Sequence, residues 1–206
     1  FKKREQKQEE AVDDENLPLV TVQIPTFNEL VAIRCAKSCL AFDYPKDRYE
    51  IVIGDDSNRP EISKKLKEFA MQHGMVKVIK RQSNIGYKPG NLNNMLDHSK
   101  GEIIVIFDSD FAPQPDFLKR IVQPFMKDKK TAGVQARWKL INYNQNLVSV
   151  LGSTIVSTCH HVTIPFMYQR RGITFLCGSA EAVRKSVLTE IGRWESGNLT
   201  EDIEFS

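Results

Sequence analysis

The sequence predicts an α/β domain in which a mostly parallel central sheet is flanked by helices on both faces. Short apolar runs alternate with amphipathic segments through the first half of the chain, which is typical of a sheet built from strand–helix–strand units. Turns rich in carboxylates follow directly after two of these runs, and open α/β sheets bind their ligands at this end of the strands. The fold class and the candidate chemistry therefore point to the same edge of the sheet.

The bulk composition is ordinary for a globular protein and does not indicate a nucleic-acid partner. The 206 residues are 41% hydrophobic and 27% charged, which suits one large domain, or one domain plus an arm. Because 29 basic residues nearly balance 26 acidic ones, there is no excess of positive charge for nucleic acid. The four cysteines form no CxxC pair and are expected to be buried apolar side chains, which is typical of a reducing compartment.

No membrane-spanning segment is expected within the sequence. No stretch reaches the roughly 18 to 20 apolar residues that a span needs, and the chain opens with the charged run FKKREQKQEE rather than a signal peptide. Because the chain lacks an initial Met and ends in a charged, helix-like stretch, a longer protein with membrane segments outside this chain is expected.

Residue patterning gives the order of elements in the first half. Residues 1–16 are charge-dense and are expected to form a mobile or helical arm. Strands are then expected at Leu19–Ile24, Glu50–Ile53, Met75–Ile79 and Ile103–Phe107. The helices between them are expected at about 30–41, 60–73 and 90–98.

The second half is expected to continue with both kinds of element. They are, in order, a helix over 114–127, a strand over 132–136, a long helical stretch over 144–168 that is interrupted near Pro165, a strand over 173–177 and a helix over 181–191.

Two acidic clusters follow expected strands. Asp108-Ser109-Asp110 comes directly after the run 103–107; two carboxylates one residue apart can give a divalent cation hard oxygen ligands while nucleotide phosphates supply others. The alternative is an acidic turn that only caps the next helix. Asp55 and Asp56 follow an earlier strand, where they can accept from a base or a ribose hydroxyl, or form an Asx turn that caps the next helix.

Five separated stretches together carry a specific resemblance. They are Pro25-Thr-Phe-Asn-Glu29, Asp55-Asp-Ser57, Lys88-Pro-Gly-Asn-Leu-Asn93, Asp108-Ser-Asp110 and Thr200-Glu-Asp202. In their order and spacing, over residues 17–206, the chain resembles the family 2 inverting glycosyltransferases of the GT-A (Rossmann-like) fold. Within that family it looks most like the membrane-bound processive polysaccharide synthases, such as cellulose synthase and glucomannan synthase, on the further evidence of Val134–Trp138 and Phe175–Ser179.

One departure from those synthases matters. They carry a QxxRW motif downstream of the TED segment, followed by more membrane helices, and this sequence ends before that point. Gln135-Ala-Arg-Trp138 is not that motif, because it lies upstream of TED and has one residue too few between Gln and Arg. Residues 17–206 are therefore expected to be a catalytic domain truncated before QxxRW. Trp138 itself either stacks on an acceptor sugar ring or belongs to the core.

The resemblance implies a pocket for the nucleotide of a UDP-sugar. It assigns Thr26, Glu29, Asp55 and Asp56 to this pocket, with Asp55 and Asp56 meeting the uracil and the ribose, although which of the two reads the base stays open. Asn28 is expected to brace the turn instead.

The resemblance also implies the groups that meet the diphosphate. Lys88 would face it as a mobile point charge, with a solvated loop lysine as the alternative, and the helix expected to begin at Gly90 and Asn91 would favour an anion at its start. Asp110 is implied as the principal ligand of Mg²⁺ or Mn²⁺. Asp108 is implied as a partner of the sugar or ribose hydroxyls and as a second metal ligand.

For the acceptor side, the resemblance implies that Asp202 is the catalytic base. Inverting transfer needs a base that takes the proton of the acceptor hydroxyl; the alternative is that Thr200 caps a helix with acidic residues in its first turn. The acceptor sugar would be bordered by Phe175, Cys177, Gly178, Ser179 and Glu201.

The expected function is metal-dependent inverting transfer of a sugar from a UDP-sugar to a growing β-glycan. The expected location is the cytoplasmic face of a membrane, as the catalytic domain of an integral membrane protein. Two alternatives remain: a non-processive family 2 transferase that acts on a lipid-linked or protein-linked acceptor, and a catalytically silent nucleotide-binding subunit.

Overall fold

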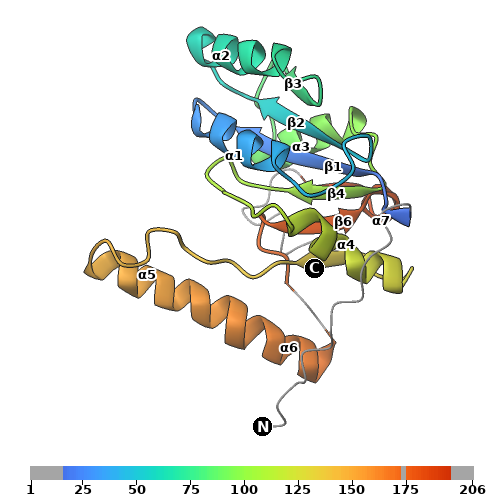
Figure 1. The fold of residues 1–206 in the computed structure, drawn as a ribbon, viewed down its shortest axis with the longest axis vertical. Coiled ribbons are helices and arrows are strands. Elements are labelled where there is room, and N and C mark those ends of the chain that lie inside the picture. Colours follow the sequence, from blue (N-terminus) through green and yellow to red (C-terminus); the bar gives the residue numbers. More distant parts are fainter. Residues whose placement is uncertain (1–15, 173–174, 196–206) are drawn as a thin grey trace.

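A six-stranded sheet in the order β3-β2-β1-β4-β6-β5 forms the centre of the domain (Figure 1). The computed structural model describes residues 16–172 and 175–195. The strands are β1 Val20–Thr26, β2 Tyr49–Asp55, β3 Val76–Lys80, β4 Ile103–Ile106, β5 Gly133–Gln135 and β6 Glu181–Arg184. The helices are α1 Val31–Leu40, α2 Pro60–Met71, α3 Tyr87–Asp97, α4 Phe117–Lys127, α5 Leu147–Thr158, the π-helical turn η2 Cys159–Thr163, α6 Ile164–Arg171 and α7 Lys185–Glu190.

The four strands of the first half pair in parallel, as the alternating pattern predicts. β1 lies between β2 and β4, with Thr26 opposite Asp55 and Gln23 opposite Ile106, and β3 flanks β2. Because parallel strands end on the same side of a sheet, the turns after β1, β2 and β4 meet at one edge. The mostly parallel α/β fold predicted from the sequence is confirmed.

Helices cover both faces of the sheet, and strand residues alternate between two cores. Val105 of β4 packs in the larger core with residues of α1, α2 and α4, whereas Ile104 and Ile106 pack in a second core with α3 and α7. All three side chains are fully buried. β4 reads as continuously apolar because a strand inside a parallel sheet has no polar face. It is therefore a rigid base for the acidic turn that follows it.

The prediction of a helix over Glu181–Ile191 is wrong in its first part. Residues 181–184 form β6, which pairs antiparallel with both β4 and β5, and α7 begins only at Lys185. Ala182 and Val183 are fully buried. Their packing and the ladder bonds on both sides outweigh the helical propensity of Glu, Ala and Arg.

Other boundaries differ near the candidate site. The expected start of a helix at Gly90 is wrong: α3 begins at Tyr87, so Lys88 lies in its first turn rather than in a loop. Gly86 precedes that turn and Tyr87 opens it, with φ angles of 72° and 46°, a left-handed backbone that only glycine adopts readily. Phe175–Cys177 form no strand, and residues 173–174 lie outside the described residues, as does nearly all of the expected arm over 1–16.

α5, η2 and α6 form one unbroken helical rod, 147–171, which lies apart from the layers around the sheet (Figure 1). The interruption expected near Pro165 is absent. In the π-helical turn before it, the Ile164 N–H donates to the Cys159 carbonyl, a wider hydrogen-bonding step than that of an α-helix. Pro165 then falls in the first turn of α6, where its missing N–H is tolerated.

The expectation that the chain has no membrane-length apolar segment is wrong for this rod. Leu147–Arg170 is a helix of 24 residues whose 18-residue window has a mean hydropathy of 1.4 and is 6% buried, so by length and composition it could cross a membrane. Its Ser and Thr residues interrupt the apolar run in the sequence. Their hydroxyls, however, donate to the helix's own carbonyls, as Thr154 does to Val150 and Thr158 to Thr154, and this hides much of their polarity.

Candidate active site

The turn after β4 forms a contact cluster with two segments that are distant in the sequence. Lys88, from the first turn of α3, places its Nζ 2.9 Å from Asp108 Oδ1 and donates to the Gly178 carbonyl at 2.7 Å. The Asp108 backbone N–H donates to Ser179 Oγ at 2.8 Å. Lys88 and Asp108, which are expected to bind the sugar donor, thus lie in contact with the 177–179 segment, which is expected to border the acceptor sugar.

Two side chains hold the 177–179 segment from the sheet. Buried Glu181, the first residue of β6, accepts the backbone N–H groups of Cys177 and Gly178 at 3.1 and 2.8 Å. Gln135, the last residue of β5, accepts the Cys177 N–H at 2.7 Å and donates to the Ser179 carbonyl at 3.0 Å. Because charge-assisted bonds to buried backbone groups are strong, the position of this segment is fixed by two strands.

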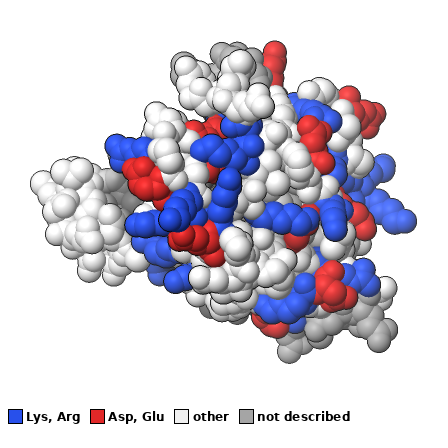
Figure 2. Space-filling view, turned by 90° about the horizontal axis from the view of Figure 1, so that it is seen from above, with Lys and Arg blue, Asp and Glu red and all other residues white. Residues whose placement is uncertain are grey.

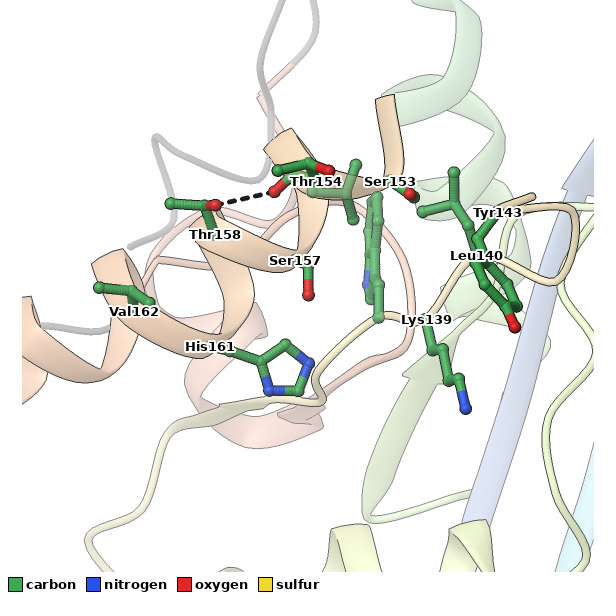
Figure 3. A pocket seen from close by; sticks show the side chains of 11 residues that line it. Lys139, Leu140, Tyr143, Ser153, Thr154, Ser157, Thr158, His161 and Val162 are labelled. Atoms are coloured by element: carbon green, nitrogen blue, oxygen red, sulfur yellow. Dashed lines mark hydrogen bonds between the residues drawn. The ribbon is translucent and has the colours of Figure 1, made fainter. Parts of the chain in front are cut away.

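Trp138 supports the same segment and packs, partly buried, against the core. Its indole N–H donates to the Ser179 carbonyl at 2.9 Å. Its ring lies 5.3 Å from Phe111, edge-on, and is stacked 4.7 Å from His160 of the helical rod. Of the two alternatives for Trp138, membership of the core is the one that these contacts favour. Beside it, a groove of about 650 Å³ runs between the chain after β5 and the rod, lined by hydroxyl, imidazole and aromatic side chains (Figure 3).

The turn after β1 is tied to the turn after β4 and to the start of α2. Ser109 Oγ donates to Glu29 Oε2 at 2.5 Å, and Thr26 Oγ1 donates to the Glu29 backbone carbonyl at 3.2 Å. Asn28 Oδ1 accepts the N–H groups of Asn58 and Arg59 at 3.1 and 3.2 Å, which is the bracing role expected for it.

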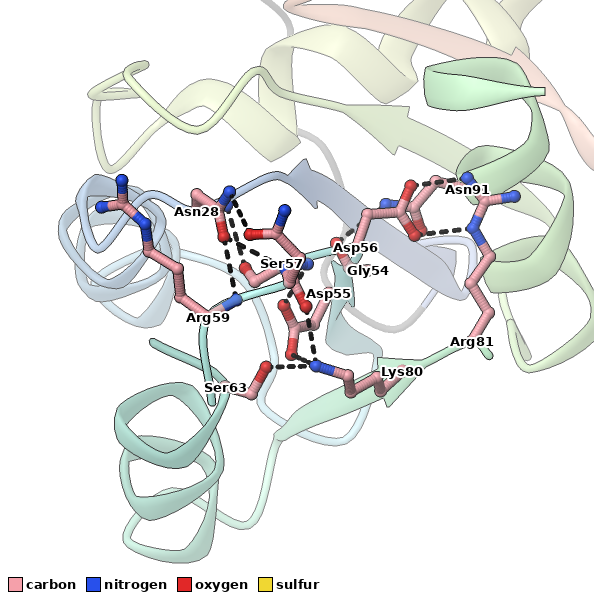
Figure 4. A network of polar contacts seen from close by, with 11 residues as sticks. Asn28, Gly54, Asp55, Asp56, Ser57, Arg59, Ser63, Lys80, Arg81 and Asn91 are labelled. Carbon is pink, nitrogen blue, oxygen red and sulfur yellow. Dashed lines mark hydrogen bonds and ion pairs between the residues drawn. The ribbon is translucent and has the colours of Figure 1, made fainter. Parts of the chain in front are cut away.

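Asp55 ends β2 and is fully buried; Figure 4 shows it beside Ser57 and Lys80. Its Oδ1 accepts the Ser57 N–H at 2.9 Å, which is an Asx turn, and its Oδ2 lies 3.6 Å from Lys80 Nζ. Burial alone would raise the pKa of this carboxyl, but hydrogen bonds from Ser63 and Ser57 and the Lys80 charge outweigh it and lower the pKa. Asp55 is therefore held ionised beneath the turn.

Asp56 makes a two-point ion pair with Arg81, the residue after β3 (Figure 4). Arg81 Nε donates to Oδ1 at 2.6 Å and Nη2 to Oδ2 at 2.5 Å, and the side chains are only 13% and 6% exposed. The same guanidinium donates to the carbonyls of Ile85 and Tyr87. Arg81 thus fastens the end of β2 to the loop that leads into α3.

Asp110 differs from the other carboxylates at this edge. Its side chain is exposed, and within 16–172 and 175–195 no hydrogen bond or ion pair engages its carboxylate. Its backbone carbonyl accepts from Arg34 Nη2 at 2.8 Å. The backbone is therefore held while the carboxylate remains accessible.

The donor set suits a divalent cation that is bound together with a nucleotide. Among the described residues, no three His, Cys, Asp or Glu side chains gather to hold a metal by themselves. Asp108 and Asp110 offer hard carboxylate oxygens, and Mg²⁺ is usually held by one or two carboxylates plus substrate phosphates. The open Asp110 carboxylate fits that requirement.

The described residues include only part of the site expected from the sequence. They also include residues at the site that the sequence did not indicate. Glu201 and Asp202 lie outside the described residues. Lys80, Arg81 and Glu181 were not expected at the site, yet they fix Asp55, Asp56 and the 177–179 segment. Lys80 and Arg81 stand at the end of a strand, so applying the strand-end rule to β3 as well would have found them.

Comparisons with known proteins agree on the family. The family described as "Glycosyltransferase like family 2" matches residues 18–206. The chain is 32% identical over 210 residues to glucomannan 4-beta-mannosyltransferase 2 of Arabidopsis thaliana, covering 96% of this chain and 39% of that protein. It is 31% identical over 195 residues to cellulose synthase 2 of Novacetimonas hansenii, covering 92% of this chain and 12% of that protein. The chain thus spans well under half of either relative.

Solved structures show the same fold. The mannosyltransferase PcManGT from Pyrobaculum calidifontis, in complex with GDP-Man and Mn²⁺, has a TM-score of 0.70 at 22% identity over 94% of this chain and 52% of its own. TarS of S. aureus has a TM-score of 0.62 at 21% identity over 91% of this chain and 32% of its own. The GT-A fold expected from the five motifs is confirmed, and the family match over residues 18–206 shows that the chain belongs to the family 2 glycosyltransferases.

Proposed function

We propose that this domain transfers a sugar from a UDP-sugar to a hydroxyl of a growing β-glycan, with inversion and with the help of Mg²⁺ or Mn²⁺. The observation that carries the proposal is the cluster in which Lys88 Nζ bridges Asp108 and the Gly178 carbonyl at 2.9 and 2.7 Å, next to the open carboxylate of Asp110. The glucomannan and cellulose synthase relatives support a glycan product.

On the donor side, Asp108 and Asp110 would hold the cation against the diphosphate. The cation would supply charge stabilisation for the departing nucleotide. Lys88 would add a second positive charge there, and the first turn of α3, in which it lies, presents backbone N–H groups that favour an anion. The Mn²⁺ in the PcManGT complex supports the use of a metal.

The nucleotide pocket would lie around Thr26, Glu29, Asp55 and Asp56. Because Asp55 is fully buried and Asp56 is paired with Arg81, backbone groups or a rearranged Asp56 would meet the base, with Asp55 acting from beneath. The structural neighbours are divided: PcManGT is in complex with GDP-Man, and TarS with UDP-GlcNAc. We keep UDP as the proposal and test GDP beside it.

On the acceptor side, Asp202 would be the base and Glu201 a neighbour of the acceptor sugar, both on the strength of the TED motif. Phe175 and the 177–179 segment would border the same sugar. The clamps from Gln135 and Glu181 support this assignment, because an acceptor hydroxyl must be placed accurately for in-line attack. The protein would work at the cytoplasmic face of a membrane.

The test is thermal unfolding of the chain with UDP, GDP or buffer, each with Mn²⁺ or EDTA. A ligand at about 100 times its Kd adds about 2.7 kcal/mol to the folded state, which for a domain of this size raises Tm by roughly 5 to 10 °C. We expect that rise with UDP and Mn²⁺ and its loss in Asp110→Ala. Asp47→Ala, an exposed aspartate in the turn before β2 at the opposite edge, is the matched control and should respond as wild type.

The outcomes distinguish UDP from GDP and test the metal site and the donor site. A rise with GDP alone would replace UDP by GDP. A rise that persists in EDTA and in Asp110→Ala would refute the metal site. No rise with either nucleotide would refute the donor site in this chain.

A further inference from the structure

We infer that the rod formed by α5, η2 and α6 lies along the surface of an anionic lipid bilayer, with one apolar stripe inserted among the lipids. This attachment is independent of the proposed sugar transfer. It concerns a helix that carries none of the site residues described above, and it can be measured without any nucleotide.

The stripe consists of large apolar side chains on the outward side of the rod. They are Val148, Leu151, Ile155 and Phe166, which are 77%, 56%, 71% and 55% exposed. Spacings of three and four residues place Val148, Leu151 and Ile155 on one side of α5, and Phe166 lies beyond the π-helical turn, in α6. His160 and Ile164 are buried, and His160 stacks on Trp138 of the domain. A contiguous exposed apolar surface of this kind marks an interaction site.

The charges on the rod indicate the nature of the partner. Residues 147–171 contain two arginines and no Asp or Glu, although the whole chain has 29 basic and 26 acidic residues. Arg170 lies over the Phe166 ring at 5.4 Å from its centroid, at the end of the stripe. In Figure 2 the amino-terminal end of the rod projects at the left as a lobe with no charged side chain, while mixed charges cover the body. An apolar stripe accompanied only by positive charge suits an anionic lipid surface.

The contacts of the rod favour a helix that lies on the bilayer over one that crosses it. Midway along the rod, His160 stacks on Trp138, which is hydrogen-bonded to Ser179. The strands on either side of the rod in sequence pair with each other, with Gln135 opposite Glu181. A crossing helix would need its middle in hydrocarbon and its ends on opposite sides. Both requirements conflict with a middle that is packed on the domain.

Membrane attachment would place the 177–179 segment close to the lipid. Trp138 contacts both the rod, through His160, and this segment, through Ser179. The groove beside Trp138 (Figure 3) would then open at the edge of the bilayer.

The test is co-sedimentation of the 206-residue chain with vesicles of phosphatidylcholine, with and without phosphatidylserine. We expect binding to the phosphatidylserine vesicles that weakens as salt is raised. Leu151→Glu/Ile155→Glu should weaken it by about tenfold or more, because two inserted side chains become charged. Met71→Glu, on an equally exposed apolar residue of α2, should bind as wild type. Phe166→Glu is a second variant, and circular dichroism confirms that each variant is folded.

Three results would overturn the inference. The first is equal binding of wild type and both stripe variants. The second is self-association through the stripe, seen by size-exclusion chromatography, without vesicle binding; this would assign the stripe to a second copy of the chain. The third is retention on vesicles after alkaline carbonate extraction, which removes surface-bound proteins and would show a crossing helix. Nucleotide-dependent Tm shifts, measured on the same samples, report on the donor site separately.

Discussion

Replacing Arg81 by Met should show how firmly the end of β2 is fastened to the loop before α3. The guanidinium makes two short bonds to Asp56 and further bonds to the carbonyls of Ile85 and Tyr87. Methionine keeps much of the apolar stem but removes all of these donors. The Asp56 carboxylate, which is 6% exposed, is then left in the protein without its cation.

The expected loss of unfolding free energy in Arg81→Met follows from the burial of the Arg81–Asp56 ion pair. Removing one partner of a buried ion pair costs about 3 to 5 kcal/mol, because the other charge stays desolvated. The two carbonyl bonds are exposed, so water replaces them at a cost of about 0.5 kcal/mol or less each. Since Arg81 is 13% exposed, we expect a loss at the lower end of that range, about 3 kcal/mol. Asp56→Asn should cost less, and the double variant should fall short of the sum by about 1 to 3 kcal/mol.

The assay is urea unfolding at neutral pH of the two single variants and the double variant. The control is the exposed pair Lys64–Glu68, at 3.9 Å with side chains 78% and 54% exposed; Lys64→Met and Glu68→Gln should each change the unfolding free energy by about 0.5 kcal/mol or less. A loss below about 1 kcal/mol for Arg81→Met, or strict additivity with Asp56→Asn, would refute the buried-pair reasoning.

Two further predictions concern pH and glycine. Burial alone would raise the pKa of Glu50, but hydrogen bonds from Lys77, the Lys100 N–H and Thr21 outweigh it and place the pKa below the ordinary 4.5. The group therefore stabilises the fold above about pH 4.5, and this contribution is lost as the pH falls through the lower folded-state value. Urea unfolding of Glu50→Gln across the acid range should show a flatter loss of stability than wild type, and parallel curves would contradict this. Gly90→Ala should destabilise the domain by about 1 to 3 kcal/mol, because its Cβ would lie 2.2 Å from the Ile85 carbonyl oxygen and 2.5 Å from Arg81 Nη1. In α5, the Cβ of Gly152→Ala would meet nothing within 4 Å, and this variant should stabilise the domain by about 0.5 to 1 kcal/mol. If both variants change the unfolding free energy in the same direction, the close approach at Gly90 does not determine the effect of Gly90→Ala.

The elements that could be predicted are those whose pattern is local. β1, β2 and β4 are short apolar runs closed by polar turns, and their burial on two faces produces that pattern directly. The same rule placed Asp55, Asp56 and Asp108 at the ends of strands, where the structure has them. For these parts, a few neighbouring residues carry the information.

The parts that were missed depend on partners distant in the sequence. β6 exists because β4 and β5 pair with it on both sides, whereas its own residues favour a helix. Likewise, nothing near Asp55 in the sequence shows that Lys80 will lie beneath it. Whether a carboxylate at a strand end faces a ligand or an internal cation is decided by the neighbouring strand.

The carboxylates at this edge therefore enter ligand binding in different states. Asp55, Asp56 and Asp108 each have a cation, namely Lys80, Arg81 and Lys88, whereas the Asp110 carboxylate is accessible. In the proposed site, a metal ion on Asp108 and Asp110 would compete with Lys88 for Asp108 and turn the lysine toward the diphosphate. Lys88 also holds the Gly178 carbonyl, so the same movement would reach the acceptor segment. Metal and nucleotide should then strengthen each other's binding by the same factor, because linkage between two binding sites is reciprocal.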